Sequence, residues 1–213
     1  MSKGYSSKEL RQDPLFLRND FPISGKYGMP IIKKCDVDIS TLNLIGSDKI
    51  KINETQMSLS ILRTVHFFLD DNKLERYYYQ PQKYIERLAQ YPHVLTPDYS
   101  LYTDMSIAMQ IFNTFKNRWC GAYWQEHRLS VIPTVGWSTN ASYEFCFDGL
   151  ENGTVVAVST IGGLKNKDLF LRGYFEMKER IAPKQVLCYG NAFPEMGDEV
   201  IAVDYKKTIW RAK

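Results

Sequence analysis

The stretch that decides the fold is residues 94–149, where VLTPDYSLYTDM (94–105), NRWCGAYWQ (117–125), VIPTVGW (131–137) and YEFCFDG (143–149) follow one another closely. Short apolar runs in this stretch end repeatedly in Asp, Arg, Gln, Trp or Glu. That pattern is typical of buried strands that deliver polar side chains to one edge of a sheet. We therefore expect a functional site at that edge.

The alternation of strands and helices extends along most of the chain. Apolar strand-like segments lie near residues 65, 94, 131, 156 and 187, and helices are predicted at about 81–90, 105–119 and 166–181. This order favours an α/β protein with a mainly parallel sheet and outer helices. A full eightfold barrel needs ~250 residues, so a reduced or distorted (β/α) barrel-like sheet is expected, with an open doubly wound sheet as the alternative.

Individual segments carry local signals. MPIIKKC (29–35), LRTVHFFLDD (62–71) and EVIAVDY (199–205) are predicted as strands, and residues 36–56 as a strand or hairpin. The helix at 105–119 places an apolar stripe on one face, and the helix at 166–181 begins after Asn166, a plausible N-cap. The residues of the apolar stripe are Met105, Met109, Phe112, Phe115 and Trp119.

Composition describes an ordinary globular protein. The chain has 213 residues, 44% of them hydrophobic, which suits one sizeable core. We expect residues 1–30 to form an irregular N-terminal arm and residues 31–213 a single α/β domain. A net charge of +3 is well short of the basic balance typical of a dedicated nucleic-acid coat protein.

The chain has four widely spaced cysteines, and no histidines lie near them at the spacing of metal ligands. They are Cys35, Cys120, Cys146 and Cys188. This spacing predicts neither a zinc site nor a disulfide, and no metal site is expected. The N-terminal residues contain no apolar signal core, and no run approaches the ~20 apolar residues of a membrane span. We therefore expect a cytoplasmic protein with no membrane contact.

Asp98 is the sharpest candidate for chemistry, because Pro97 ends a strand and leaves Asp98 and Tyr99 in the loop above the sheet. An Asp in that position can act as a base, as a nucleophile or as an acceptor for a ligand N–H. The alternative is an Asx turn that satisfies the loop backbone. Tyr99 is predicted to contact the ligand.

Three further candidates for catalysis are Asp104, Arg118 and Glu144, which fall at strand or helix ends of the same block. Converging carboxylates can divide the roles of acid and base between them. Asp104 is equally well placed to cap the following helix.

Arg118, Trp124 and Gln125 combine planar donors with aromatic faces, as sites for single-stranded nucleic acid do. A structural alternative is an arginine stacked on a tryptophan at the edge of the core. Trp137, at another strand end, is included among the ligand-binding candidates.

STIGG (159–163) comes just before a predicted helix whose start carries lysines. Its hydroxyl groups and backbone N–H groups resemble those of a phosphate-binding loop. Thr160 and Lys165 are therefore predicted to bind a ligand. The P-loop and dinucleotide fingerprints are both missing, so no cofactor is specified.

VLTPDYSLYTDM, NRWCGAYWQ, VIPTVGW, FCFDG and VAVSTIG together resemble the core blocks of a family known as domain of unknown function 4417. The resemblance covers residues from about Phe21 to Gly190. It implies a setting in Gram-positive bacteria, their phages and mobile elements, and no particular activity.

Two functional hypotheses follow. The first is a phage or mobile-element accessory protein that engages a nucleotide or nucleic acid in a strand-end pocket, with or without catalysis. The second is a non-catalytic protein that binds a host defence or replication factor and inhibits or recruits it.

Overall fold

A computed structural model describes residues 6–50, 63–163 and 166–204. Its first parallel sheet pairs four strands in chain order: β3 (Leu44–Gly46), β4 (Thr64–His66), β5 (His93–Leu95) and β6 (Val131–Ile132). A second parallel sheet pairs β7 (Val156–Ser159), β8 (Val186–Tyr189) and β9 (Val200–Val203), also in chain order. The predicted α/β class and the parallel pairing of these segments are confirmed.

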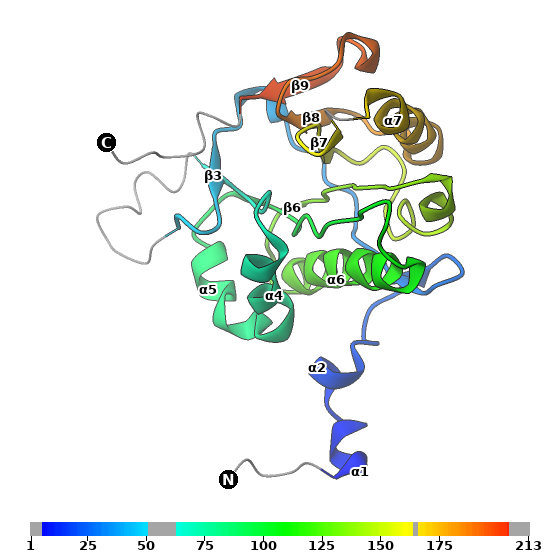
Figure 1. Cartoon of the computed structure of the whole chain (residues 1–213). Helices are drawn as coiled ribbons and strands as arrows, with labels where there is room; N and C mark the ends of the chain where they lie inside the picture. Colours follow the sequence, from blue (N-terminus) through cyan, green and yellow to red (C-terminus); the bar gives the residue numbers. More distant parts are fainter. Residues whose placement is uncertain (1–5, 51–62, 164–165, 205–213) are drawn as a thin grey trace.

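The two sheets are joined where Thr134, just beyond β6, bridges to Ala157 of β7. The strands therefore follow one another in sequence order, as in a barrel, without the reversal of a doubly wound sheet. Among the described residues β9 does not pair with β3, so the arrangement is open and distorted. In Figure 1, β9 lies at the top beside β8 and β7, and β3 lies to the left.

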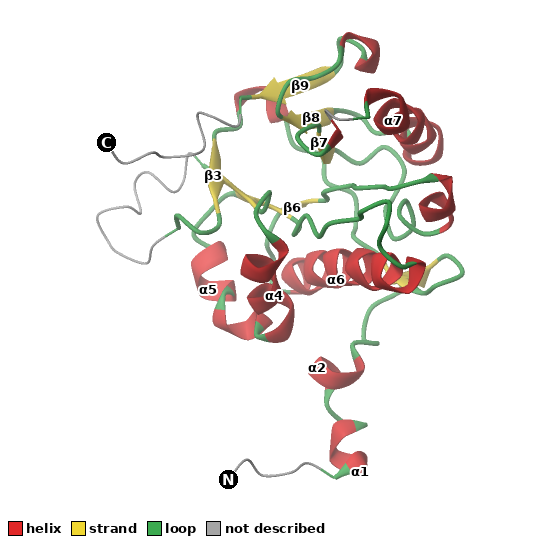
Figure 2. Cartoon of the chain, in the orientation of Figure 1, coloured by secondary structure: helices red, strands yellow, loops and turns green. Residues whose placement is uncertain are grey.

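Helices connect the parallel strands and lie outside them (Figure 2). Between β4 and β5 the chain forms α4 (Asp71–Tyr79), the 3-10 turn η3 (Pro81–Lys83) and α5 (Ile85–Leu88). The long helix α6 (Ile107–Glu126) precedes β6, and η4 (Asn140–Glu144) precedes β7. Helix α7 (Lys167–Ile181) joins β7 to β8, and η6 (Pro194–Met196) precedes β9.

Strand β4 is much shorter than the strand predicted at 62–71, because a helix begins at Asp71. Leu74, Tyr77 and Tyr78 of α4 are buried, at the i, i+3 and i+4 spacing of an amphipathic helix. The prediction for α7 is confirmed: the Asn166 side chain accepts a hydrogen bond from Leu169 N–H at 3.1 Å and caps the helix.

Side chains of β7 and β8 alternate between two apolar clusters. Val156, Val158, Val186 and Cys188 pack with the inner residues of α7, whereas Leu187 and Tyr189 join the core of β4–β6 and α4. This alternation follows from the two-residue period of a strand, which sends successive side chains to opposite faces. All four cysteines are buried and unpaired.

The N-terminal residues 6–30 form two one-turn helices, α1 (Ser7–Leu10) and α2 (Pro14–Leu17), and a hairpin of β1 (Ile23–Ser24) with β2 (Met29–Pro30). Figure 1 shows α1 and α2 extending beyond the body on the side of α6. The segment predicted as a strand at 29–35 is thus mostly irregular, and Ile32 bridges to Leu150. The proposed boundary between an arm and a single domain at residue 30 stays a prediction.

In the segment 36–56, the described part holds the turn η1 (Ile39–Thr41) and β3, which pairs in parallel with β4 and not as a hairpin. Residues 51–56 of that prediction lie outside the described residues. Within the described parts of the chain, no helix is both long and apolar enough to cross a membrane.

Candidate ligand site at the carboxyl edge of the parallel strands

Helix α6 faces the strand ends with a row of polar side chains. Gln110, Asn113, Thr114, Asn117 and Arg118 follow the 3–4 spacing of one helix face, and each is buried. Further along the same face, Gly121 allows close contact: a Cβ there would lie 2.4 Å from Ile32 Cδ1 and 2.8 Å from Thr96 Cγ2. The polar face of α6 therefore lies toward the sheet.

Because α6 turns its polar face toward the sheet, only part of the predicted apolar stripe is buried. Trp119 is buried and Phe115 packs against both clusters. At the start of the helix, Met109 and Phe112 are 51% and 38% exposed. The stripe therefore contributes to the core only in its second half.

The polar row holds the loop between β5 and α6 by its backbone carbonyls. Asn117 Nδ2 donates to Pro97 O at 2.7 Å, and Asn113 Nδ2 donates to Ser100 O at 2.7 Å. Gln110 Nε2 donates to Met105 O at 2.9 Å. Since these amides donate to backbone carbonyls spread along the loop, they fix the path of residues 97–105.

Arg118 lies in a cage of backbone carbonyls. Its Nε donates to Asp148 O at 2.8 Å, Nη2 to Cys146 O at 2.6 Å and Nη1 to Thr134 O at 3.3 Å. Nη1 also donates to Asn117 Oδ1 at 2.5 Å, so four of the five guanidinium N–H groups are satisfied. Burial lowers the pKa of Arg118 to about 10, which leaves the side chain charged at neutral pH. Arg118 thus fastens α6 to the loops after β6.

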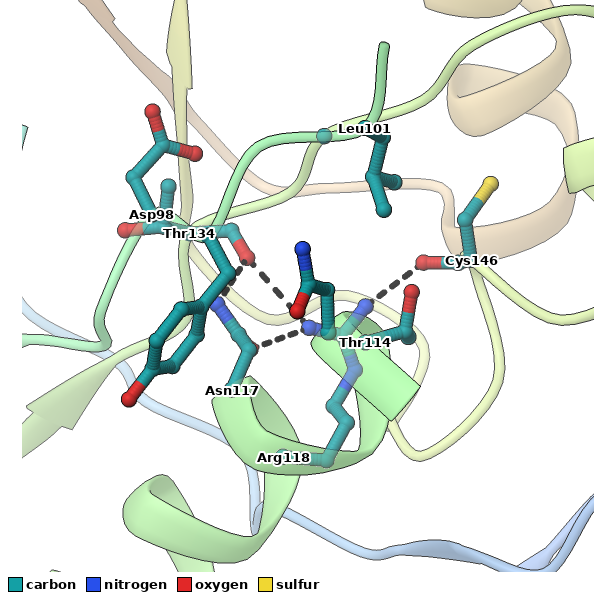
Figure 3. A pocket seen from close by; sticks show the side chains of 10 residues that line it. Asp98, Leu101, Thr114, Asn117, Arg118, Thr134 and Cys146 are labelled. Atoms are coloured by element: carbon teal, nitrogen blue, oxygen red, sulfur yellow. Dashed lines mark hydrogen bonds between the residues drawn. The ribbon is translucent and has the colours of Figure 1, made fainter. Parts of the chain in front are cut away.

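A small cavity lies between these loops and α6 (Figure 3). Its volume of about 10 Å³ is room for roughly one water molecule. The lining residues are Asp98, Tyr99, Leu101, Asn113, Thr114, Asn117, Arg118, Thr134, Gly136 and Cys146. The structure therefore brings two predicted catalytic residues, Asp98 and Arg118, to one cavity together with the predicted ligand-binding residue Tyr99.

Asp98 and Arg118 do not face each other across the cavity. In Figure 3 the Asp98 carboxylate points away from the Arg118 guanidinium. The Asp98 carboxylate makes no hydrogen bond or ion pair with the residues that the structure describes, and its Oδ1 lies 3.8 Å from the position of a Cβ on Gly136. Asp98 is therefore a free carboxyl group at the strand ends of β5 and β6.

Burial, with a smaller contribution from the Asp71 carboxylate, raises the pKa of Asp98 to about 7. The Asp71 carboxylate itself accepts hydrogen bonds from Ser100 N–H at 3.1 Å and Ser100 Oγ at 2.9 Å. A carboxyl group that titrates near neutral pH can both give and take a proton. It can also donate or accept a hydrogen bond, depending on the ligand.

Tyr99 and Trp124 have structural contacts. The Tyr99 hydroxyl donates to Leu74 O at 3.1 Å, and the Lys116 ammonium lies 4.1 Å from the Tyr99 ring centroid. Trp124 is fully buried beside Phe67, with ring centroids 5.0 Å apart. The ring of Trp124 therefore has no face open to a ligand in this structure.

Gln125 and Trp137 also bind the protein itself. Gln125 exchanges two hydrogen bonds with the backbone of Lys33, at 2.8 and 2.9 Å. Trp137 Nε1–H donates to Phe170 O at 3.2 Å, and its ring packs on that of Phe170 at 5.0 Å. Arg118, Trp124 and Gln125 thus do not form a joint stacking site, because each is held by separate contacts within the protein.

The remaining candidates lie apart from the cavity. Asp104 is exposed in a turn, and the N-cap of α6 is Ser106, so the expected cap at Asp104 is wrong. Glu144 is exposed, with its Oε2 3.7 Å from Lys26 Nζ. Thr160 is buried beside Cys188, and Lys165 lies outside the described residues.

Sequence reasoning missed Gln110, Asn113 and Asn117. Their signal was present as polar residues at helical spacing on α6, but the apolar residues at helical spacing on the neighbouring face gave a stronger pattern. No group of three or more His, Cys, Asp or Glu side chains in the described part of the chain is arranged to hold a metal ion.

Comparisons with known proteins agree with the family resemblance of the sequence blocks between Phe21 and Gly190. The chain is 35% identical over 192 residues to the gene 1 protein of Mycobacterium phage L5, covering 89% of this chain and 82% of that protein. It is 34% identical over 189 residues to the gene 1 protein of Mycobacterium phage D29, covering 87% and 68%. No solved structure matches. Residues 21–206 match the family described as "Domain of unknown function (DUF4417)", and the chain belongs to that family.

Proposed function

We propose that this chain is a phage or mobile-element accessory protein that binds a nucleotide or nucleic acid at the carboxyl edge of its parallel strands. The observation that carries the proposal is Asp98: a carboxyl group at a strand end that has no hydrogen-bond or ion-pair partner within residues 6–50, 63–163 and 166–204, with its pKa raised to about 7. Ligands of parallel α/β proteins bind at this edge of the sheet. The phage origin of the relatives supports the setting, in the cytoplasm of a bacterial host.

The chemistry of Asp98 suits a nucleobase. A base edge presents N–H donors beside carbonyl or ring-nitrogen acceptors, and a carboxyl group near its pKa can pair with either kind. The cavity beneath Asp98 is the size of one water molecule, so the ligand would lie above the cavity and not in it. The same titration range is what a general acid or base needs, which supports an enzymatic version of the proposal.

Binding should depend on Asp98. In calorimetric titrations with mononucleotides and short single-stranded oligonucleotides, we expect Asp98→Asn to weaken binding at least tenfold, because the carboxyl group is lost at nearly constant volume. Asp104→Asn is the matched control, since Asp104 is exposed in the same loop and outside the cavity. Equal affinities for the Asp98→Asn variant and the wild type would contradict the proposal, as would no binding by the wild type.

A surface observation favours the second candidate, a protein that binds a host factor. Phe16, Leu17, Tyr79, Met109 and Phe112, here called the aromatic surface, are all exposed. Tyr78 connects two of them, since its ring lies 5.8 Å from Phe112 and 5.1 Å from Tyr79, and the same ring lies 4.1 Å from the guanidinium of Arg18, the residue after Leu17. Exposed apolar groups that adjoin one another are typical of protein-binding surfaces.

If a host factor binds there, we expect expression of the wild type to slow growth of host cells, a Met109→Ser, Phe112→Ser variant to lose this effect, and Asp98→Asn to keep it. Removing two partly exposed apolar side chains at the centre of such an interface costs binding affinity by tenfold or more. Phe175→Ser, at an exposed position on α7, serves as the control. Loss of the effect in Asp98→Asn with retention in the double variant would reject this candidate.

A further inference from the structure

His66, at the end of β4, is a buried histidine whose two ring nitrogens differ in their contacts. Its side chain is enclosed by protein, and only 2% of the residue is exposed. Nδ1 accepts a hydrogen bond from Phe68 N–H at 3.3 Å, whereas Nε2 has no hydrogen-bond partner among the residues that the structure describes. Buried polar groups are almost always paired, so this nitrogen calls for an explanation.

The protonation state of His66 follows from these contacts. Burial lowers its pKa to about 4, against a smaller opposing effect of Asp48, so the ring is neutral at neutral pH. Because Phe68 N–H donates to Nδ1, the single ring proton is on Nε2. His66 therefore presents an N–H donor, and it cannot coordinate a metal ion through Nε2 in this tautomer.

The Nε2 edge faces the space above Gly46 on the neighbouring strand β3. A Cβ on Gly46 would lie 3.6 Å from His66 Nε2 and 2.6 Å from Asp48 Oδ1. The Asp48 carboxylate therefore crowds the position beside this glycine, and a ligand reaches Nε2 where that side chain turns away. Asp48 is exposed, so its side chain can turn toward solvent when a ligand enters.

The surroundings of His66 distinguish between kinds of acceptor. The Asp48 carboxylate disfavours a phosphate or carboxylate oxygen at Nε2, because two negative groups would then share one site. A neutral carbonyl oxygen has no such cost. The imidazole lies against aromatic rings, with centroids 5.9 Å from Phe68 and 4.9 Å from Tyr189, and Phe68 is only partly buried.

We propose that His66 Nε2–H donates a hydrogen bond to the carbonyl oxygen of a nucleobase, whose ring packs against Phe68 at the space above Gly46. This inference rests on the proposed function and narrows it to the carbonyl-bearing bases guanine, uracil, thymine and cytosine. Adenine has no carbonyl group and would leave the buried N–H unpaired. In enzymes a neutral imidazole held in this way polarises a substrate carbonyl, so the same contact serves catalysis if the protein is an enzyme.

Asp98 belongs to the neighbouring strand end, since its backbone N–H lies 3.4 Å from Phe67 O. A ligand held at His66 is thus next to the loop that carries Asp98. The two residues place a donor and a titratable carboxyl group on adjacent strands of one edge. That arrangement suits a base with a carbonyl group beside an N–H group.

The test compares binding of GMP, UMP, CMP and AMP, and of the matching single-stranded homo-oligonucleotides, to the wild type and to three variants. For the wild type we expect at least tenfold weaker binding of AMP than of GMP, UMP or CMP. His66→Phe keeps the ring but lacks the donor, and should abolish this preference. Gly46→Ala fills the space with a methyl group and should weaken all the carbonyl-bearing nucleotides. His93→Gln, at the opposite end of β5, should behave as the wild type.

A spectroscopic readout separates binding from a structural role of His66. In ¹⁵N-edited NMR spectra, the Hε2 resonance of His66 should move downfield when GMP or UMP binds and stay in place with AMP. Folding of each variant is checked by thermal unfolding.

Binding that depends on Asp98 but shows no preference among bases, or is unchanged in His66→Phe, would overturn this inference and leave the proposed function standing. If His66 Nε2–H contacts only an ordered water, the Hε2 resonance will not shift with any nucleotide, and that result also overturns the inference. No binding of any nucleotide or oligonucleotide by the wild type would overturn both. A preference for oligonucleotides over mononucleotides would identify nucleic acid as the source of the base.

Discussion

Replacing Asp98 by asparagine is expected to stabilise the folded protein at pH 8, and the gain is expected to vanish below pH 4. Burial and the Asp71 carboxylate raise the pKa of Asp98 from 3.8 to about 7 in the folded state. Between those pH values the unfolded chain releases a proton that the folded chain keeps. The stability of the wild type therefore falls as the pH rises from about 4 to about 7.

The size of this effect is bounded by the pKa difference, which corresponds to at most about 4 kcal/mol. We expect roughly 2 kcal/mol for Asp98→Asn at pH 8, because the amide is also polar and stays without a partner. Urea denaturation of the wild type and the variant at pH 4, 6 and 8 measures the difference. Asp104→Asn should show no comparable trend, and parallel pH profiles for the Asp98→Asn variant and the wild type would contradict the titration of Asp98 near pH 7.

Removing the guanidinium of Arg118 is expected to be the most destabilising single change at the site. Arg118→Met keeps a long side chain but leaves Cys146 O, Asp148 O and Asn117 Oδ1 without their donor. Each unsatisfied buried group costs ~1–3 kcal/mol, so the variant should lose about 3–5 kcal/mol in the free energy of unfolding. For a chain of this size that is a drop of ~10 °C in Tm.

Arg118→Lys tests whether charge or geometry matters. A lysine keeps the charge but cannot match the planar fork that reaches three carbonyls at once, so its stability should resemble that of Arg118→Met. Arg172→Met, at an exposed position on α7, is the control for loss of an arginine in a helix. If Arg118→Met unfolds at the same denaturant concentration as the wild type, the hydrogen bonds of Arg118 to the backbone carbonyls do not stabilise the fold, and this prediction is wrong.

The two effects also separate the parts that Asp98 and Arg118 play. Asp98 is a destabilising group at neutral pH, as expected of a residue kept for its chemistry. Arg118 is expected to stabilise the loops around the cavity, and among the described residues it forms no ion pair with a carboxylate. The sequence patterns predicted both residues at the same edge and both in catalysis, and the catalytic roles stay predictions.

Local sequence patterns were sufficient to predict the strands and helices whose apolar periodicity and capping residues lie within a few residues of one another. The strands around Val94, Val131 and Val186, and helix α7 with its Asn166 cap, could be predicted because apolar periodicity and capping are local properties. The position of Asp98 at a strand end followed from Pro97 and from the common direction of parallel strands. Helix α4 was missed because the largely apolar run at 65–69, directly before it, suits a strand.

The sequence by itself therefore determined the α/β class, the parallel direction of the strands and the edge at which Asp98 lies. Only the tertiary structure decided that α6 turns its polar face to the sheet, that Trp124 is enclosed and that Arg118 binds carbonyls. The physical reason is that an amide or guanidinium on a helix can satisfy backbone groups 15–30 residues away in sequence, as Asn117 does for Pro97 and Thr134 and Arg118 does for Cys146 and Asp148. Such partners depend on how the loops return to the helix, and no local spacing encodes that path.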